Sequence, residues 1–331
     1  MKILTIGGAT QDITFHTKEG ILVKNSQDLL RQQLLGFELK AKINIPQANF
    51  TFGGGAANTA INFSNLGNTV STLVCLGDDS IGQTILQNFK DYKISTNLIQ
   101  ISGEKRTAIS CIINAKNLEQ EHVLFTYRGA NEELKINADK LIPEQKFDLL
   151  YLASLSGKNH RSNLSKIFRY KNNKLNQAAL AWNPGNLQIQ LGLNGLKPYL
   201  QKTDIFLVNK DEAIEICASS TEKVNHKLTN PRDLLKILSK SCPGIVVITD
   251  GDNGAYALYN KKIYFEPALK MREKDTTGVG DAFCSTFSWA VYSTHFDIQK
   301  SLNLAVKNAA AVLKKVGAQN GLLSKNQLLS L

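Results

Sequence analysis

Six short apolar segments, separated by stretches with helical spacing, constrain the fold of this chain more than any other feature. Several are near-continuous runs of aliphatic residues, as expected for parallel strands that helices cover on both faces. Alternation of such strands with helices is typical of α/β proteins. The segments are KILTIGG, STLVCLG, FDLLYLASL, AALAWNP, DIFLVN and GIVVITDG. We therefore predict an α/β fold with a central, mostly parallel sheet.

A second type of segment alternates apolar and polar residues and has no helix between its members. Residues 13–24, 42–52 and 107–129 show this pattern, which favours antiparallel strands with one exposed face. No internal repeat and no linker rich in Pro or Ser separates them from the rest. The chain has 331 residues and 43% hydrophobic content, enough for one large core with a small added lobe. We expect a single domain over residues 1–331, with a β-sheet lobe formed by about 13–52 and 104–128.

Charge and cysteine usage argue against several functional classes. The net charge is +11, but Lys and Arg occur in short, separated groups without interleaved aromatic residues. We expect no nucleic-acid partner and only modest attraction to small anions. The five cysteines show no CxxC spacing and the five histidines no paired ligand spacing. Reduced, buried thiols and no protein-bound transition metal are therefore expected.

Neither a membrane segment nor a leader is recognisable in the sequence. No run approaches the roughly 20 apolar residues that a membrane-spanning helix needs. The opening MKILTIGGATQD passes directly into a predicted strand and lacks the basic and apolar regions of a signal peptide. We expect a cytoplasmic protein without a membrane partner.

The stretch KDTTGVGDAF, residues 274–283, combines features of an anion site. Gly278, Val279 and Gly280 would present backbone N–H groups at the start of a buried helix, where the helix dipole favours negative charge. The position of Asp281 in the first turn allows two interpretations. It either complements the dipole, or it accepts a hydroxyl proton while the N–H groups stabilise a transferring phosphoryl group.

A second glycine-rich stretch, FGGGAANTAINFSNLG, precedes another predicted helix. Gly53 to Gly55 would let a ligand approach the backbone, and the amides of Asn58 and Asn62 could bind hydroxyl groups. A tight turn with close helix packing is the alternative. The chain has neither the GxGxxG spacing after its first strand nor a GxxxxGK loop, so dinucleotide-binding and P-loop folds are not expected.

The segment DTTGVGDAF resembles the D-T-x-G-x-G-D pattern of the ribokinase-like carbohydrate kinases, the PfkB family. Seven further motifs occur in the family's order: GGATQD, FGGGAANTA, LGDDSIG, YRGAN, VNKDEA, TDGDNGA and NAAAVLKKVGA. The resemblance implies a ribokinase-like three-layer α/β sandwich whose small β-sheet forms a lid over the sugar site. It also implies ATP-dependent phosphorylation of a primary hydroxyl on a sugar or sugar-like substrate, with ATP, Mg²⁺ and, in many members, K⁺.

The resemblance assigns roles to individual residues on the phosphoryl side. Asp281 would be the general base, and Gly278, Val279 and Gly280 would form the anion hole. Asp275 lies where many members bind a monovalent cation. The remaining matches would bind the nucleotide: Asn209, Glu212, Thr249, Gly251, Gly254, Thr276 and Asn308. Of these, Asn209 and Glu212 would also act indirectly on the Mg²⁺ bound to ATP. Without the resemblance, Asn209 and Glu212 would be interpreted as a helix cap and a surface charge.

On the acceptor side, the resemblance assigns hydroxyl binding to Asp12, Gly54 and Asn58. Asp12 alone would be interpreted as a turn residue. Arg128, at the end of the predicted lid, faces either an anionic substrate or an acidic partner on the surface. Edges of the lid could also pair two chains into a homodimer.

Departures from the family pattern leave the acceptor open. Val279 replaces a frequent Ala. Ribose-specific members carry an acidic residue after the strand at 147–155, where this chain has Ala153, Ser154 and Ser156. The cations Lys270, Arg272 and Lys274 could clamp a phosphorylated sugar or lie in solvent. Trp182 could stack on a base or lie in the core. An adenosine-like nucleoside kinase and a non-catalytic sugar-binding protein therefore remain alternatives.

Overall fold

A computed structural model describes most of the chain. The described residues are 1–24, 33–115, 123–137, 146–172, 177–219, 229–271 and 274–331. Within these ranges, no helix is both long and apolar enough to cross a bilayer. Arg272 and parts of the predicted lid lie outside the described residues.

An eight-stranded sheet runs through the body of the molecule, in the order β16-β15-β14-β13-β12-β11-β1-β6. Its strands from β14 to β6 are parallel, and β15 and β16 extend one edge as an antiparallel hairpin. All six apolar segments of the sequence contribute strands to it. The bounds are β1 Lys2–Ile6, β6 Thr69–Leu73, β11 Leu149–Leu152, β12 Ala179–Trp182, β13 Ile205–Asn209, β14 Ile245–Thr249, β15 Ala255–Tyr259 and β16 Lys262–Glu266.

Alternate residues of each strand belong to two separate hydrophobic cores. In β14, Ile245 and Val247 join one core, whereas Val246 and Ile248 join the other. Successive side chains of a strand point to opposite faces, so helices cover both faces. The first core contains α1 Gly55–Asn65, α2 Ser80–Asp91, α9 Val279–Ser293, α10 Ile298–Val312 and α11 Lys325–Leu329. The second contains α4 His160–Lys171, α5 Asn186–Ile189, α6 Gly192–Leu200, α7 Lys210–Ala218 and α8 Pro231–Ser239. The predicted three-layer sandwich is confirmed.

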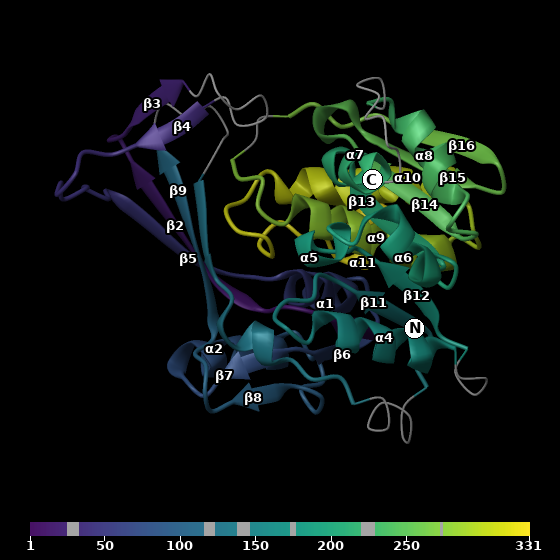
Figure 1. Cartoon of the computed structure of the whole chain (residues 1–331), viewed down its shortest axis with the longest axis horizontal. Helices are drawn as coiled ribbons and strands as arrows, with labels where there is room; N and C mark the ends of the chain where they lie inside the picture. Colours follow the sequence, from purple (N-terminus) through teal and green to yellow (C-terminus); the bar gives the residue numbers. More distant parts are fainter. Residues whose placement is uncertain (25–32, 116–122, 138–145, 173–176, 220–228, 272–273) are drawn as a thin grey trace.

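A smaller four-stranded sheet stands at one side of the body, with the antiparallel strand pair β3–β4 at its far end (Figure 1). Its order is β10-β9-β2-β5, and the alternating segments of the sequence form it. The bounds are β2 Thr10–Thr17, β3 Ile21–Lys24, β4 Gln33–Gly36, β5 Gln47–Gly53, β9 Ala108–Ala115 and β10 Val123–Tyr127. A short pair, β7 Cys75–Gly77 with β8 Gln100–Ser102, lies on the body nearby.

The two faces of this small sheet differ in chemistry. Asp12 is directly opposite Thr51 and Ser110, so these polar residues share one face. The next row across the sheet, Ile13 with Phe50, Cys111 and Phe125, lies on the other face. The sheet therefore presents a polar face and an apolar face.

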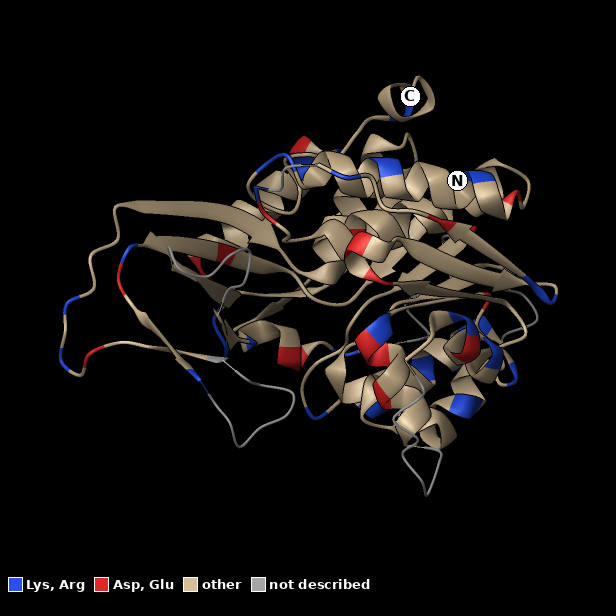
Figure 2. Ribbon diagram, turned by 90° about the horizontal axis from the view of Figure 1, so that it is seen from above, with Lys and Arg blue, Asp and Glu red and all other residues tan. Residues whose placement is uncertain are grey.

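Lys and Arg are spread over helices and loop ends, with Asp and Glu between them (Figure 2). Helix α10 ends at Val312, and Gly317 has a positive φ of 87° in the loop that follows. That loop reaches the glycine-rich segment before α9, where Lys274 donates its backbone N–H to the carbonyl of Leu313 (2.8 Å).

Asp79 of the LGDDSIG motif joins the body to the small sheet. One carboxylate oxygen accepts the N–H of Gly82 in the first turn of α2 and the hydroxyl of Thr107. The other accepts the backbone N–H of Thr107, just before β9 (2.8 Å). The motif is therefore a helix cap that also anchors a strand of the small sheet.

Replacing Asp79 by Ala should lower the free energy of unfolding by about 2 kcal/mol or more, because a helix cap and charge-assisted bonds to Thr107 are lost together. Denaturant titration followed by circular dichroism measures this change. Asp78→Ala, at the exposed neighbouring position, is the matched control and should change stability little. Equal effects of the two substitutions would contradict the anchoring role.

Candidate active site

Helix α9 begins at an open glycine corner. Gly278 precedes its first residue with a left-handed φ of 77°, and a Cβ on Gly278 would collide with Ala318 of the loop after α10. At Gly280, by contrast, a Cβ would meet nothing within 4 Å. The first-turn N–H groups of a helix have no partners within the helix. The corner thus combines backbone donors with free space, as an anion site requires.

Asp281 lies in the first turn of α9 and is partly buried. Its Oδ2 accepts a hydrogen bond from the side-chain amide of Asn58 on α1 (2.8 Å). Its Oδ1 faces Gly55 and would lie 3.5 Å from a Cβ atom added at that glycine. Burial raises the pKa of Asp281, the bond from Asn58 opposes that rise, and the charge of Asp12 adds to it. The structure therefore brings the predicted base and a predicted hydroxyl-binding amide together.

Asp12 is almost fully buried at the start of the small sheet, 5% exposed. The absence of a side chain at Gly53 makes room for its carboxylate, because a Cβ there would overlap both oxygens. Burial raises the pKa of Asp12, while hydrogen bonds from Thr10 and Ser110 oppose the rise. Carboxyl groups with raised pKa values, such as Asp12 and Asp281, are candidates for a functional site.

Gly54 supports this arrangement through its backbone conformation. Its φ is 95°, and a Cβ would lie 2.6 Å from the carbonyl oxygen of Gly8. That carbonyl accepts N–H groups of Ala56 and Ala57 at the start of α1. The first strand's loop and α1 are thereby in direct contact, which places Asp12 and Asn58 near each other.

Residues predicted for the nucleotide side lie at the carboxyl ends of β13 and β14. Asn209 and Glu212 form a reciprocal capping box at the start of α7, with two bonds of 2.8 Å. Asn209 pairs directly with Thr249 in the sheet register, and Lys210 contacts Asp250 at 3.2 Å. Burial raises the pKa of Glu212, and nearby carboxylates, including Asp281, raise it further. The interpretation of Asn209 and Glu212 as a helix cap is therefore confirmed. The charge of Asp281 also acts on the carboxyl group of Glu212.

The loop after β14 forms the short 3₁₀ helix η2 Gly251–Asn253. Gly251 is exposed, with φ 50° and open space where a Cβ would stand. Gly254 is buried with φ 102°, and a Cβ there would collide with the carbonyl of Glu266. Gly254 is required by packing, whereas Gly251 leaves a surface to which a ligand has access.

Asp275 connects the loops on either side of α9 and α10. Its two oxygens accept the backbone N–H groups of Thr277 (2.9 Å) and Gly317 (2.8 Å). Thr276 next to it is exposed. An Asp carboxylate offers about four acceptor positions, so these two bonds leave capacity for a cation.

Two of the predicted residues lie apart from this cluster. Asn308 is fully buried in α10, and its amide contacts Asn62, Thr286 and the backbone of Leu323. Both of its N–H donors are used in these contacts, so it links α1, α9 and α10 beneath the site. Arg128 is exposed at the entry to η1 Gly129–Glu133.

The structure decides the interpretation of Trp182. Its side chain is fully buried in the second core, with edge-on ring contacts to Phe168 and Phe206. The base-stacking interpretation of Trp182 is therefore wrong, because no face of the ring is accessible to a ligand.

Lys274 is exposed and Lys270 lies on the segment leaving β16.

Sequence reasoning missed three polar side chains that organise the site. Asn131 accepts the N–H of Ala9 and donates to its carbonyl (both 3.1 Å), which fixes the loop after β1. Gln319 donates to the side-chain oxygen Oδ1 of Asn58 (3.0 Å), and the side-chain amide of Asn88 donates to Oε1 of Gln319 (3.0 Å). Asn131 and Gln319 stand in or beside recognised motifs, YRGAN and KKVGA, but nothing in the spacing predicts these contacts.

Comparison with known proteins identifies the family. The model of the pfkB family carbohydrate kinases matches residues 28–326. The chain belongs to this family. The resemblance seen in the sequence is thereby confirmed, and the protein is an ATP-dependent carbohydrate kinase by class.

Individual relatives of this pfkB family member act on sugars or nucleosides. A ribokinase of Dictyostelium discoideum is 25% identical over 296 residues, covering 84% of this chain and 88% of the relative. The crystal structure of a nucleoside kinase from Methanocaldococcus jannaschii has a TM-score of 0.77 at 22% identity, with 99% and 97% of the two chains covered. An E. coli structure described as ribokinase II, in complex with ATP and Mg²⁺, has a TM-score of 0.75 at 16% identity, with 99% and 98% covered.

The raised pKa of Asp281 predicts a pH-dependent gain of stability on substitution. Folding raises the pKa of such a carboxyl group. The group therefore lowers the free energy of unfolding as the pH rises from its pKa in the unfolded state to its pKa in the folded state. Asp281→Asn should therefore increase the free energy of unfolding at pH 7, and the gain should vanish in acid, below the ordinary carboxyl pKa of about 4.

Denaturant unfolding at both pH values measures this effect. Asp211→Asn, which removes an exposed carboxylate in the first turn of α7, is the control. A variant at position 281 that is less stable than wild type at neutral pH would contradict the proposed burial of charge.

Proposed function

We propose that this kinase transfers the γ-phosphoryl group of ATP to a primary hydroxyl of a sugar or sugar-like acceptor, with Asp281 as general base. The supporting observation is the position of Asp281. It lies at the open N-terminus of α9, with one oxygen bonded to Asn58 and the other facing the side-chain-free position of Gly55. Phosphoryl transfer requires a base beside N–H donors, and the start of α9 offers both, although the N–H of Val279 also makes a long bond to the carbonyl of Thr276 (3.4 Å).

In this proposal Asp281 accepts the proton of the acceptor hydroxyl. The hydroxyl oxygen then forms a bond to the γ-phosphorus, and the bond to the bridging oxygen of ADP breaks. The N–H groups of Gly278, Val279 and Gly280 stabilise negative charge on the transferring group. The open space at Gly280 provides room for the phosphoryl oxygens. The raised pKa of Asp281 makes it a stronger base than an exposed carboxylate.

ATP and Mg²⁺ fit the residues at the carboxyl ends of β13 and β14. Thr249, Gly251 and Gly254 would bind the nucleotide through a loop whose outer glycine is open to a ligand. Asn209 and Glu212 would orient the phosphates and the water shell of Mg²⁺, and Thr276 would contact phosphate. Mg²⁺, when bound, neutralises phosphate charge. Asp275 retains acceptor capacity for K⁺, and Asn308 would contribute only by supporting α9 and α10.

The acceptor would bind between the small sheet and α1. Asp12, Gly54 and Asn58 line this region, and Arg128 would contact an acceptor that carries negative charge. The methyl group of Ala153 packs beside Gly7 and Gly55. A Cβ atom added at either glycine would lie 3.0 Å from this methyl group. Because a methyl group stands where ribose-specific members carry an acidic side chain, we infer an acceptor other than ribose. Burial of Trp182 removes the residue that favoured a nucleoside.

The small sheet, about residues 13–52 and 104–128, would act as the lid of the single domain 1–331. Its polar face carries Asp12 toward the acceptor region. A lid that closes on the acceptor excludes water and suppresses hydrolysis of ATP.

Asp281→Asn should reduce kcat by about 10²- to 10⁴-fold, the usual contribution of a general base. The KM values for ATP and acceptor should change little, because the amide keeps the shape of the side chain but does not accept the proton. Steady-state release of ADP, measured over hexoses, pentoses, sugar phosphates and nucleosides, tests this.

Asp211→Asn, on the exposed first turn of α7, is the activity control and should retain wild-type turnover. Wild-type turnover in Asp281→Asn would overturn the base assignment. Tight acceptor binding without turnover in the wild type would instead support a non-catalytic binding protein.

The apolar face of the lid supports a homodimer through the lid. Phe50, Phe125 and Tyr127 are 65%, 61% and 49% exposed on this face, and a large exposed apolar patch marks an association surface. Phe125→Asp should convert a dimer to a monomer in sedimentation velocity. Leu331→Asp, at the exposed C-terminal residue, should leave the dimer intact. A monomeric wild type at all concentrations would exclude this association.

A further inference from the structure

Three side-chain amides form a continuous hydrogen-bonded chain that ends on Asp281. Asn88 on α2 donates to Oε1 of Gln319 (3.0 Å), Gln319 donates to Oδ1 of Asn58 (3.0 Å), and Asn58 donates to Oδ2 of Asp281 (2.8 Å). The amide relay, as we call Asn88, Gln319 and Asn58, joins three segments that are distant in sequence. It lies outside the DTTGVGD motif.

The relay has a fixed polarity. An amide side chain presents two donors on nitrogen and an acceptor on oxygen, and either end could face a neighbour. The carboxylate of Asp281, which only accepts when ionised, requires the nitrogen end of Asn58. Gln319 reinforces this orientation by donating to the oxygen end of Asn58, and Asn88 does the same for Gln319. Each amide therefore fixes the direction of the next.

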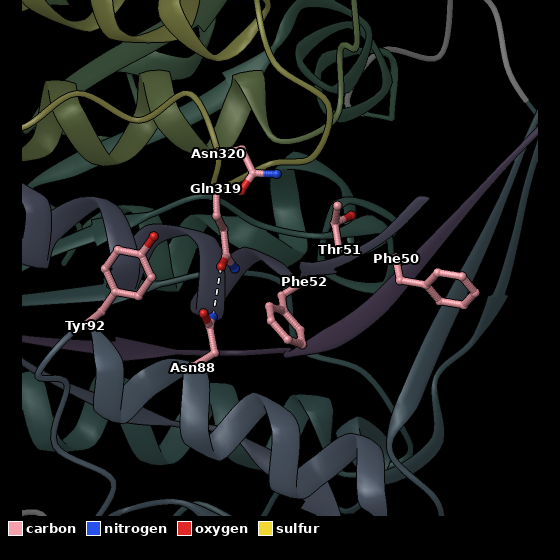
Figure 3. A pocket seen from close by; sticks show the side chains of 7 residues that line it. All are labelled: Phe50, Thr51, Phe52, Asn88, Tyr92, Gln319 and Asn320. Atoms are coloured by element: carbon pink, nitrogen blue, oxygen red, sulfur yellow. Dashed lines mark hydrogen bonds between the residues drawn. The ribbon is translucent and has the colours of Figure 1, made fainter. Parts of the chain in front are cut away.

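The end of the relay near Asp281 is buried, and the end at Asn88 lines a small cavity. Asn58 and Gln319 are 5% and 8% exposed. The cavity, about 150 Å³, is lined by Phe50, Thr51, Phe52, Asn88, Tyr92, Gln319 and Asn320. Figure 3 shows Gln319 reaching toward Asn88, with Tyr92 on one side and Phe52 on the other. Because little water reaches the inner amides, reversal of one amide is not compensated by solvent.

We infer that Gln319 and Asn88 are positioning residues, which orient Asn58 so that Oδ2 of Asp281 is occupied and Oδ1 is left as the proton acceptor. The inference rests on the proposed function and specifies which oxygen is the base. Oδ1 faces Gly55, where the missing side chain leaves an approach for the acceptor hydroxyl. Asn58 thus has two partners that favour the same orientation: the carboxylate of Asp281 accepts from its nitrogen, and Gln319 donates to its oxygen.

Reversal of the relay from its outer end tests the inference. Asn88→Asp replaces the terminal donor by an acceptor of the same shape. Gln319 then turns its nitrogen toward position 88 and its oxygen toward Asn58, and Asn58 in turn presents its oxygen to Asp281. Asn88→Ala removes the terminal bond without forcing a reversal. Gln319→Glu imposes the same reversal from another segment, and Gln319→Met does not.

The expected result is a loss of kcat of roughly tenfold or more in Asn88→Asp and Gln319→Glu, since a hydrogen bond to a charged group is lost. Asn88→Ala and Gln319→Met should lose less, and KM for ATP should stay at the wild-type value in all four. Gln83→Glu, an exposed amide-to-carboxylate change on the same helix, should match the wild type.

A pH profile separates positioning from a structural role. The groups that interact electrostatically with Asp281 are Asp12 on β2, Glu212 on α7, Tyr151 on β11 and Cys284 on α9. None of them is altered in these variants. Loss of the bond from Asn58 removes a contribution that lowers the pKa of Asp281, so the acid limb of the kcat profile should move to higher pH in the reversed variants. A variant that is merely less stable would keep the limb in place.

The decisive comparison is between the reversed and the non-reversed variants. Equal kcat values and equal acid limbs in Asn88→Asp and Asn88→Ala, and likewise in the Gln319 pair, would overturn the inference. Carbon-13 NMR titration of the Asp281 carboxyl, assigned with Asp281→Asn, reads the same effect without turnover. If the wild type phosphorylates no acceptor, the proposed function fails. The titration would still show whether the relay acts on Asp281.

Discussion

The hydrogen bond between Asn58 and Asp281 is the interaction on which the rest of the site depends. It joins the first turns of α1 and α9, two helices separated by more than half of the chain. A carboxylate at this position would otherwise be free to turn toward the N–H donors of its own helix and block them. With Oδ2 held by Asn58, the proposed mechanism has the N-terminus of α9 free for a phosphoryl group and Oδ1 free for a hydroxyl.

The sheet topology explains why this pair can meet. The loops that follow β1, β11, β13 and β14 leave the parallel sheet at the same edge, which is where ligands bind in open α/β sheets. Asp12 follows β1, Ala153 follows β11, and Asn209 and Thr249 end β13 and β14. Gly53 and Gly54 then admit the Asp12 carboxylate and the Gly8 carbonyl, respectively, without collision. Local glycine geometry and strand order thus act together to place the residues proposed for the acceptor and for the nucleotide near one carboxylate.

The sequence predicted the fold well because apolar runs and alternating segments report burial directly. Ile245 to Ile248 form a run that is apolar at every position, and the structure buries both faces of that strand. Asp281 and Asn58 could be selected as candidates because their motifs are local, and the structure joins them by a hydrogen bond. The amide relay escaped prediction, since Asn88 and Gln319 look like ordinary polar residues until the fold brings them together. Trp182 was ambiguous for the same reason, as its surroundings come from distant strands and helices.

Proton-coupled ³¹P NMR of the products formed from ATP, Mg²⁺ and the acceptor panel shows directly whether Asp281 and the start of α9 transfer a phosphoryl group to a primary hydroxyl. We expect ADP and a new phosphomonoester signal split into a triplet by one CH₂ group, and no such signal with Asp281→Asn. Inorganic phosphate as the only new product, or a doublet from a secondary hydroxyl, would contradict it.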